Sequence, residues 1–244
     1  MNAHQILFAS LFVAILSGCT KQSLPGFEEA LPVSVRADGV SLGPRLSHAN
    51  GMTTLSWMER SESGAQLRFA RYFDRKWRDV SDVIEDPKMF VNWADLPAVT
   101  PLGGDAFLAH WLSYSADGPY SYDVMLSRTD DAGESWATSY RPHDDGTPTE
   151  HGFVSVYPMP EGTGLLWLDG RNTPDGGMTL RAATVNAKGE LSAESEVDNL
   201  ICDCCQTDVA VASSGPVAIY RDRHAGLPRT VYVSCDVIVA HFIR

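Results

Sequence analysis

Four short segments of this chain share one plan, and they recur at nearly constant spacing. In each, an apolar run ends in an aromatic residue and is followed by charged residues. The aromatic residues, Trp57, Trp111, Trp167 and Tyr220, lie 54, 56 and 53 residues apart. A period of this size is typical of a unit of about four strands that is repeated around an axis. The spacing therefore predicts an all-β chain that folds as a β-propeller.

Each unit, or blade, is expected to follow one order of strands. A first strand precedes a glycine-containing turn, the second strand carries the aromatic residue, and a third strand follows. The first strands are expected at RLSHANG, LPAVTPLGG, FVSVYPMPEG and DVAVASSG. The third strands are expected to begin near Leu67, Asp123, Met178 and Arg229. Alternating apolar residues support strands throughout, and no long helical period is evident.

Composition limits the classes of partner. The chain has 244 residues, a formal net charge of −12 and 44% hydrophobic residues, which is typical of a globular protein. Nucleic acid is not an expected partner, because its phosphates require a basic surface. No apolar run after the N-terminal segment is long enough to predict a membrane-spanning helix.

Residues 1–19 have the features of a lipoprotein signal peptide. An apolar run of 11 residues from Ile6 to Leu16 is too short to span a membrane and suits the core of an export signal. It leads into Leu16-Ser17-Gly18-Cys19, which resembles the bacterial lipobox. The resemblance implies lipidation of Cys19 and a place in the cell envelope, on the periplasmic side of the outer membrane. An ordinary cleaved signal is the alternative, since MNAHQ contains no Lys or Arg.

The remaining sequence is expected to form a tether and a partial propeller. Residues 20–40 are assigned to the tether with a first strand, and residues 41–244 to the propeller, with about four blades of which the last is incomplete. After Ser234 the chain continues into an apolar run where a turn is expected. We interpret this as a truncated or frame-shifted product, with a genuine four-bladed ring as the alternative.

One turn in the second unit resembles a known motif. Residues 129–136, TDDAGESW, match the Asp box, [ST]-x-D-x-G-x-[ST]-W, which marks sialidase-like propellers, usually of six blades. The Asp carboxylate can accept backbone N–H bonds, the Gly permits an unusual backbone conformation, and the Trp packs between sheets. Thr129, Asp131, Gly133 and Trp136 are therefore expected to be structural, on the side away from a functional site.

Polar residues gather where first strands begin and second strands end, and these positions share one rim of a propeller. The residues expected there to bind a substrate are Arg45, Trp93, Asp95, Arg171, Arg221 and Arg223. The expected catalytic residues are Glu150, His151, Asp169, Asp203 and Asp222. Such a convergence suits a polar ligand. For Glu150 and His151 the alternative is a network with Thr149 that fixes the start of a blade.

The sialidase resemblance has limits that bear on activity. Sialidases bind a carboxylate with three arginines, and use a Tyr–Glu nucleophile pair and an Asp acid/base. Gly43-Pro44-Arg45-Leu46 faintly resembles the first-arginine motif. The units that would supply the nucleophilic Tyr and another arginine are not in this sequence, so sialidase catalysis itself is not expected. The chain also resembles bacterial exported proteins with sialidase-like propellers, through FVNWADLPAV, PHDDGTPTEHGFVSVYP, WLDGR, MTLRAATV, CDCCQTDVAV and YRDR.

The segment Cys202-Asp203-Cys204-Cys205 permits three interpretations. Export would place the thiols in an oxidising compartment, which favours a disulfide within the cluster or with Cys235. Clustered thiolates with His151 or an Asp could instead bind Zn or Cu, although the spacing matches no standard zinc motif. A redox or free-thiol role is the third. No other cofactor is expected.

These features lead to three functional hypotheses. The first is an exported, lipid-anchored propeller whose rim binds a glycan or another polar, anionic ligand. As a glycoside hydrolase it would use two carboxylates among Glu150, Asp169, Asp203 and Asp222. The second is a non-catalytic binding or scaffold propeller of the envelope, and the third is an inactive fragment of either.

Overall fold

The computed structural model describes residues 35, 39–160, 162–213, 215–223 and the backbone of 237–241. The expected signal peptide 1–19, lipidated Cys19, most of the tether and Cys235 lie outside the described residues. None of the residues described forms a helix that is long and apolar enough to cross a membrane.

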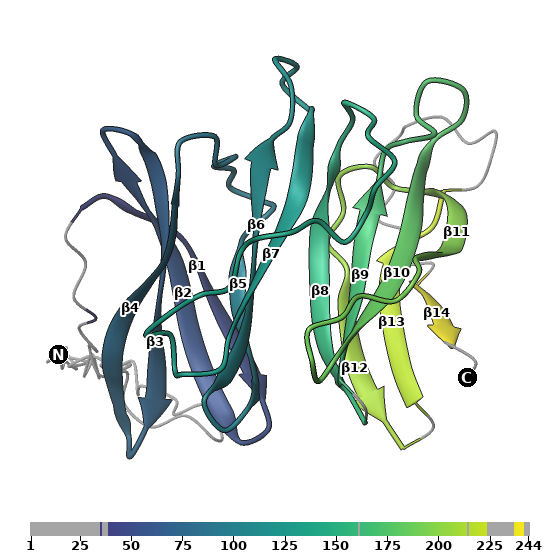
Figure 1. Cartoon of the computed structure of the whole chain (residues 1–244). Coiled ribbons are helices and arrows are strands. Elements are labelled where there is room, and N and C mark those ends of the chain that lie inside the picture. Colours follow the sequence, from purple (N-terminus) through teal and green to yellow (C-terminus); the bar gives the residue numbers. More distant parts are fainter. Residues whose placement is uncertain (1–34, 36–38, 161, 214, 224–236, 242–244) are drawn as a thin grey trace, which may run out of the picture. The chain divides into compact units, whose positions relative to one another are not determined.

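The described strands form four antiparallel sheets that follow one another along the chain (Figure 1). The first sheet contains β1 (Ser41–Ala49), β2 (Met52–Ser61), β3 (Gly64–Phe73) and β4 (Lys76–Asp86). The second contains β5 (Ala98–Gly103), β6 (Ala106–Tyr114) and β7 (Tyr122–Thr129). The third contains β8 (His151–Met159), β9 (Gly162–Asp169), β10 (Met178–Asn186) and β11 (Ser195–Ile201). The fourth contains β12 (Asp208–Ala212), β13 (Gly215–Arg221) and β14 (Val237–His241).

The first strands of consecutive sheets contact one another. β1 contacts β5, β5 contacts β8, and β8 contacts β12. Within each sheet the strands follow in sequence order away from the first strand. Successive antiparallel sheets joined through their first strands are the blades of a propeller. The prediction of an all-β propeller with about four blades is therefore confirmed.

The third strand of the fourth blade differs from the prediction. The sequence predicted it from Arg229, a segment that lies outside the described residues. The strand that pairs with β13 is instead β14, in which Ala240 lies opposite Ala218. Its sequence, VIVAH, is rich in β-branched residues, which favour a strand once a partner edge is available.

The sequences of β6 and β9 are nearly continuous apolar runs, because both faces of each strand are buried. In β6, Phe107, Ala109 and Trp111 pack into a core shared with the first sheet. The alternate residues Leu108 and Leu112 pack into a second core shared with the third sheet. Successive side chains of a strand point to opposite faces, so a strand buried on both sides is apolar at nearly every position.

The four recurring aromatic residues all lie in second strands and are buried. In β2 and β9 each Trp donates a hydrogen bond to a carboxylate two residues further along the same strand. The Trp57 Nε1 to Glu59 Oε1 distance is 2.7 Å, and the Trp167 Nε1 to Asp169 Oδ2 distance is 3.0 Å. Residues two apart in a strand share a face, which makes this contact local.

The other two aromatic residues connect neighbouring sheets. Trp111 of β6 donates to Asp86 Oδ2, in the last strand of the first sheet, at 3.0 Å. Tyr220 of β13 donates to Asp198 Oδ2, in the last strand of the third sheet, also at 3.0 Å. Each aromatic residue thus satisfies its polar hydrogen within a largely apolar surrounding.

The turn after β7 has the bonding expected from its residues. Ser135 N–H donates to Asp131 Oδ1 at 2.9 Å, and Gly133 N–H donates to Thr129 Oγ1 at 3.1 Å. The hydroxyls of Ser135 and Thr129 also donate to the Asp131 carboxylate, and hydrogen bonds, led by that from the Ser135 hydroxyl, lower the pKa of Asp131 to about 2. Trp136 packs edge-on against Phe69 of the first sheet, with ring centroids 5.9 Å apart. The turn therefore stabilises the contact between two sheets.

Candidate functional site

Five titratable side chains, from strand β1, strand β12 and the loops that precede β5, β8 and β12, influence one another electrostatically. We call them the entry cluster: Arg45, Asp95, Glu150, Asp203 and Asp208. Arg45 interacts electrostatically with Asp95 and Asp208, while Glu150 interacts with Asp95 and Asp203. The fold therefore brings four residues that the sequence predicted for the rim, Arg45, Asp95, Glu150 and Asp203, into one electrostatic group with Asp208.

Asp95 organises a strained part of β8. Its side chain is 2% exposed, and its Oδ2 accepts the Phe153 N–H at 2.8 Å. Phe153 has φ of 51° and lies in a bulge of the β8–β9 pairing, a conformation that costs a bulky residue about 1–3 kcal/mol. A Cβ at Gly152 would collide with Asp95 Oδ2. Burial is the main cause that raises the pKa of Asp95 to about 7.

Glu150 is the half-buried carboxyl group of the entry cluster. Tyr122, which is 1% exposed, donates its hydroxyl to Glu150 Oε1 at 2.6 Å and stacks on Phe90 at 4.1 Å. Burial raises the pKa of Glu150, Asp203 raises it further, and the Tyr122 bond opposes the shift. Glu150 therefore retains its proton to a higher pH than an exposed glutamate, as a general acid requires.

Arg45 reaches the cluster through an irregularity of β1. The β1–β2 register shifts between Leu42 and Arg45, and Gly43 in this bulge has φ of 57°. Arg45 Nη1 donates to Leu96 O at 3.2 Å. His110 lies near the same carbonyl, and burial followed by the charge of Arg45 lowers the pKa of His110 to about 3. His110 is therefore neutral at pH 7, and Arg45 supplies the positive charge of the entry cluster.

Trp93 is 91% exposed, in the loop between β4 and β5. The next residue, Ala94, accepts a hydrogen bond from the Gln206 side chain in the loop that leads to β12. This bond joins the Trp93 loop to the loop that carries Asp203. The flat Trp93 ring is thus open to solvent, beside a hydrogen bond that joins loops of two blades.

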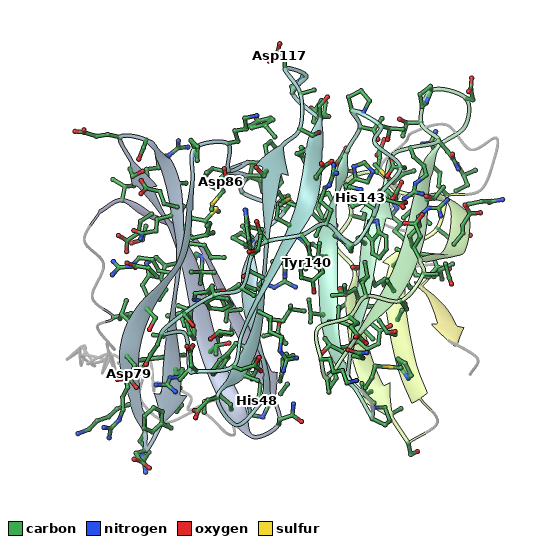
Figure 2. The ribbon with its side chains drawn as sticks, viewed as in Figure 1. His48, Asp79, Asp86, Asp117, Tyr140 and His143 are labelled. Carbon is green, nitrogen blue, oxygen red and sulfur yellow. The ribbon has the colours of Figure 1, made fainter. Side chains whose placement is uncertain are left out.

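A second group of titratable residues lies beside Glu150, and we call it the histidine–aspartate network: His143, Asp145, His151, Asp169 and Arg171. His151 Nε2 lies 3.1 Å from Asp145 Oδ2, and its ring stacks on that of His143 at 3.9 Å with an angle of 5°. Figure 2 shows His143 near the end of the third sheet where β8 begins. Arg171 Nη2 lies 2.7 Å from Asp169 Oδ2 and 3.2 Å from Asp145 Oδ2.

The network differs from the roles that the sequence suggested. His151 and Asp169 are both 0% exposed, so neither side chain can touch a ligand that arrives from solvent. His151 Nδ1 lies 3.2 Å from Thr149 O. Arg171 is engaged with Asp169, with Asp145 and with Glu194, which leaves it tied to protein carboxylates rather than open to a substrate carboxylate. The physical reason is that the 142–150 loop places His143 and Asp145 against the His151 side chain.

Residues of the network, together with neighbouring Asp123, form two groups with the residue types of a metal site. Asp123, His143 and His151 have ligand atoms within 4.8 Å of one another, as do Asp145, His151 and Asp169. The lone pair of an imidazole lies in the ring plane, so two parallel stacked rings cannot both point at one ion. In the second group the Arg171 guanidinium already pairs with both carboxylates. The network therefore fits a hydrogen-bonded cluster better than a metal centre.

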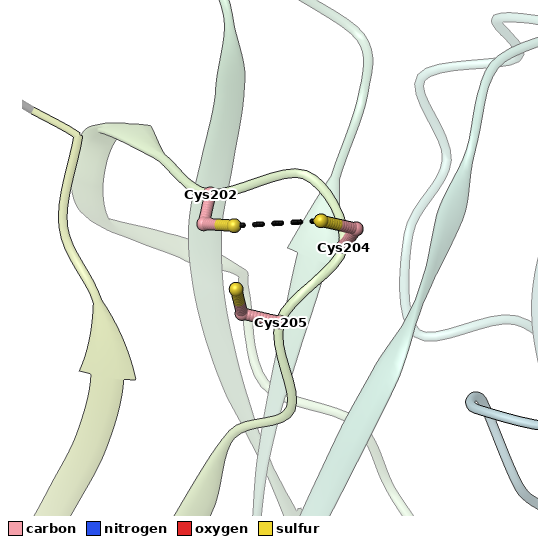
Figure 3. Close-up of side chains that lie close together, drawn as sticks. All are labelled: Cys202, Cys204 and Cys205. Carbon is pink, nitrogen blue, oxygen red and sulfur yellow. Dashed lines mark hydrogen bonds between the residues drawn. The ribbon is translucent and has the colours of Figure 1, made fainter. Parts of the chain in front are cut away.

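The cysteines and the last predicted rim residues form a separate group. Cys202, Cys204 and Cys205 are free thiols, and Figure 3 shows their sulfurs pointing toward one another. Arg221 Nη1 lies 3.7 Å from Cys205 Sγ, and Arg221 O accepts the Cys202 N–H at 2.9 Å. Asp222 pairs with Ile201, and Arg223 N–H donates to Leu200 O. Arg221, Asp222 and Arg223 thus belong to the surroundings of the thiols, apart from the histidine–aspartate network.

Sequence reasoning missed several residues in or next to the two clusters: Asp123, His143, Asp145, Tyr122, His110 and Glu194. A signal for two of them was present in PHDDGTPTE (142–150), a Gly- and Pro-containing loop with a high density of titratable residues. Loops of this composition positioned by a rigid scaffold often carry functional side chains. In the sequence, Tyr122 and His110 lie within apolar strands and have the pattern of core residues. Their polar partners, Glu150 and Leu96 O, are distant in sequence and are evident only from the tertiary structure.

No protein-family model matches the chain, and no curated protein matches it in sequence. The chain is similar to part of the NanB sialidase from Streptococcus pneumoniae, with 15% identity, a TM-score of 0.44, and coverage of 75% of this chain and 27% of that one. It is similar to an α-L-arabinanase of Penicillium chrysogenum, with 12% identity, a TM-score of 0.47, and coverage of 75% and 57%. A Dyadobacter fermentans protein described as of unknown function gives 19% identity, a TM-score of 0.48, and coverage of 76% and 63%. The chain spans less than two thirds of each of these structures.

Proposed function

We propose that the entry cluster binds a glycan and cleaves a glycosidic bond. The observation that carries this proposal is that half-buried Glu150 interacts with two further carboxyl groups, Asp95 and Asp203. Glycoside hydrolases need one carboxyl group that holds a proton and a second that is ionised nearby. Exposed Trp93 on the adjoining loop adds a surface on which the apolar face of a sugar ring can stack.

Two of the three carboxyl groups of the entry cluster that solvent can reach, Glu150 and Asp203, would divide the chemistry. Glu150, with its raised pKa, would donate a proton to the glycosidic oxygen as the leaving group departs. Asp203 would act as the base that activates water or as the nucleophile. Asp95 is a positioning residue, because it is 2% exposed and holds the backbone of Phe153.

The charges of the entry cluster favour a neutral glycan over an anionic one. The entry cluster contains four carboxyl groups and one guanidinium, that of Arg45, which interacts with Asp95 and Asp208, and the whole chain has a net charge of −12. An anionic sugar would meet repulsion at such a site. Arg45 also donates to Leu96 O, so its side chain is partly committed to the protein.

Glycan binding without cleavage is the second candidate. The Tyr122 hydroxyl already donates to Glu150 Oε1 at 2.6 Å, which stabilises the ionised form of Glu150 and opposes its use as an acid. A non-catalytic site would keep Trp93 and the carboxyl groups as hydrogen-bond and stacking partners.

A panel of aryl glycosides, neutral and sialylated, tests these proposals. Turnover of a neutral substrate should fall by about 10²–10⁴-fold in Glu150→Gln, the range typical of a lost general acid. Trp93→Ala should raise KM more than it lowers kcat. The control is Glu85→Gln, whose carboxylate bonds Ser61 on the first sheet and lies outside the entry cluster. Unchanged turnover in Glu150→Gln contradicts the assignment, while glycan binding with no turnover supports the second candidate.

Export and lipid anchoring are also proposals, and they rest on residues 1–19. The apolar run and the Leu16–Cys19 lipobox support lipidation of Cys19, with the propeller tethered at the envelope. Cells that express the full chain and are fed labelled palmitate should label it, and Cys19→Ala should abolish the label. Label that persists in Cys19→Ala contradicts the anchor.

A further inference from the structure

We propose that Cys202, Cys204 and Cys205 form a binding site for one soft metal cation, Zn(II) or Cu(I). The proposal does not depend on glycan cleavage, and its ligands flank Asp203 of the entry cluster in the sequence. All three residues lie between the end of β11 and the start of β12. In the structure the three thiols are not joined by disulfides.

The spacing of the sulfurs suits a shared ion. Cys202 Sγ and Cys204 Sγ are 3.7 Å apart, and the three sulfurs lie within 4.8 Å of one another. Two thiolates that bind one zinc ion tetrahedrally, with Zn–S bonds of about 2.3 Å, are about 3.8 Å apart. The sulfurs converge from three positions of one loop onto a common space, as Figure 3 shows. A cation there requires only small movements of the third thiol.

The loop is held at both ends, which preorganises the three ligands. Cys202 N–H donates to Arg221 O in β13 at 2.9 Å. On the other side, Thr207 Oγ1 donates to Phe153 O at 2.9 Å and contacts Ser155 Oγ at 2.8 Å. The Gln206 side chain donates to Ala94 O. The backbone that carries the thiols is therefore tied to three different sheets or their loops.

The donor set selects the class of cation. Thiolates favour soft and borderline ions such as Cu(I) and Zn(II) over Ca(II) and Mg(II), which prefer oxygen ligands. Arg221 Nη1, 3.7 Å from Cys205 Sγ, offsets part of the negative charge that three thiolates would bring. Three thiolates satisfy trigonal Cu(I), or leave Zn(II) one position for water, as in a site with an open coordination position.

The test uses the full chain, purified anaerobically with a phosphine reductant and freed of metal. Zn(II), Cu(I) and Ca(II) are titrated separately, and bound metal is counted after gel filtration. We expect one equivalent of Zn(II) or Cu(I), no Ca(II), and at least a tenfold loss of affinity in Cys202→Ser, Cys204→Ser and Cys205→Ser. Cys235→Ser, which removes a cysteine beyond the three proposed ligands, should bind as the wild type does.

Substitution with Co(II) provides a second readout, because thiolate ligation gives a charge-transfer absorption that oxygen ligands do not. The band should appear in the wild type and in Cys235→Ser, and should weaken in each cluster variant. Far-ultraviolet circular dichroism of the variants establishes that they fold. Absence of stoichiometric binding, binding that survives all three substitutions, or a disulfide between any two of the three cysteines in protein isolated without reductant would overturn the proposal.

Discussion

Asp95 links the ionisation of the entry cluster to the stability of the fold. Burial raises its pKa from 3.8 to about 7, so the folded state keeps a proton that the unfolded chain loses above pH 3.8. The folded state binds more protons in this window, and the free energy of unfolding contributed by Asp95 therefore falls as pH rises from about 4 to 7. We predict that the stability of Asp95→Asn relative to the wild type increases over the same window, because Asn remains neutral and can still accept from Phe153. Urea unfolding at closely spaced pH values measures the difference.

The prediction concerns the difference in the free energy of unfolding between variant and wild type, because His143 changes that free energy with pH in the opposite direction. Burial lowers the pKa of His143 to about 4, which makes the free energy of unfolding rise with pH between about 4 and 6.5. That contribution is common to both proteins and cancels. Asp117→Asn, at an exposed loop position, serves as the control and should give a flat difference. A flat difference for Asp95→Asn as well would contradict the raised pKa of Asp95.

Gly133 is required for two separate reasons, and substitution can separate them. Its φ is +88°, and a Cβ there would lie 2.8 Å from the ring of Phe69. Gly104 has φ of +55° with no atom within 4 Å of a built Cβ. We predict that Gly104→Ala lowers the free energy of unfolding by about 1 kcal/mol, and Gly133→Ala by about 2–4 kcal/mol because overpacking is added to the backbone cost. Equal losses in urea unfolding would show that the Phe69 contact relaxes at no cost.

At the scale of the strand and sheet, the hydrogen bond between Trp111 and Asp86 joins two blades. The bond is 3.0 Å long, and Trp111 is 2% exposed. Asp86→Ala leaves a buried indole N–H without its acceptor, so we predict a loss of about 1–3 kcal/mol in the free energy of unfolding. The loss should be smaller in a Trp111→Phe background, where no indole N–H remains. A double-mutant cycle measured by urea unfolding gives the coupling, and an equal loss in both backgrounds would contradict the bond.

The first and second strands of the blades were predictable from sequence, because each second strand is an apolar run that contains a buried aromatic residue. The third strand of the fourth blade was not, because pairing with β13 is decided by which segment reaches that edge. The entry cluster was predictable in outline, since Asp95 and Glu150 lie just before first strands that a propeller brings together and Arg45 lies within the first strand of the first sheet. The burial of His151 and the stacking of His143 depend on how the 142–150 loop folds back, which no local pattern specifies.

For the molecule as a whole, apolar burial differs strongly between blades. The strand β9 is buried on both faces, with Leu165 in the core shared with the second sheet and Leu166 in the core shared with the fourth. In the fourth sheet, Ala218 of β13 is buried whereas Ile219 is 43% exposed, and Val211 of β12 is 49% exposed. Because burial of apolar surface supplies most of the stabilising free energy, the fourth sheet should be the least stable part of the described fold.

This asymmetry predicts both the order of amide exchange and the response to two neighbouring substitutions. Amides of β6 and β9 should exchange slowest, and those of β12 and β13 fastest, in native-state hydrogen exchange. Leu165→Ala and Leu166→Ala each remove a fully buried side chain and should lower the free energy of unfolding by about 2–5 kcal/mol. Leu165→Ala should accelerate exchange in the second and third sheets, whereas Leu166→Ala should act most strongly on β12 and β13. Ile219→Ala, at a half-exposed position, should cost far less. If both leucine variants accelerate exchange uniformly in all four sheets, the blades unfold as one cooperative unit and the graded stability proposed here is wrong.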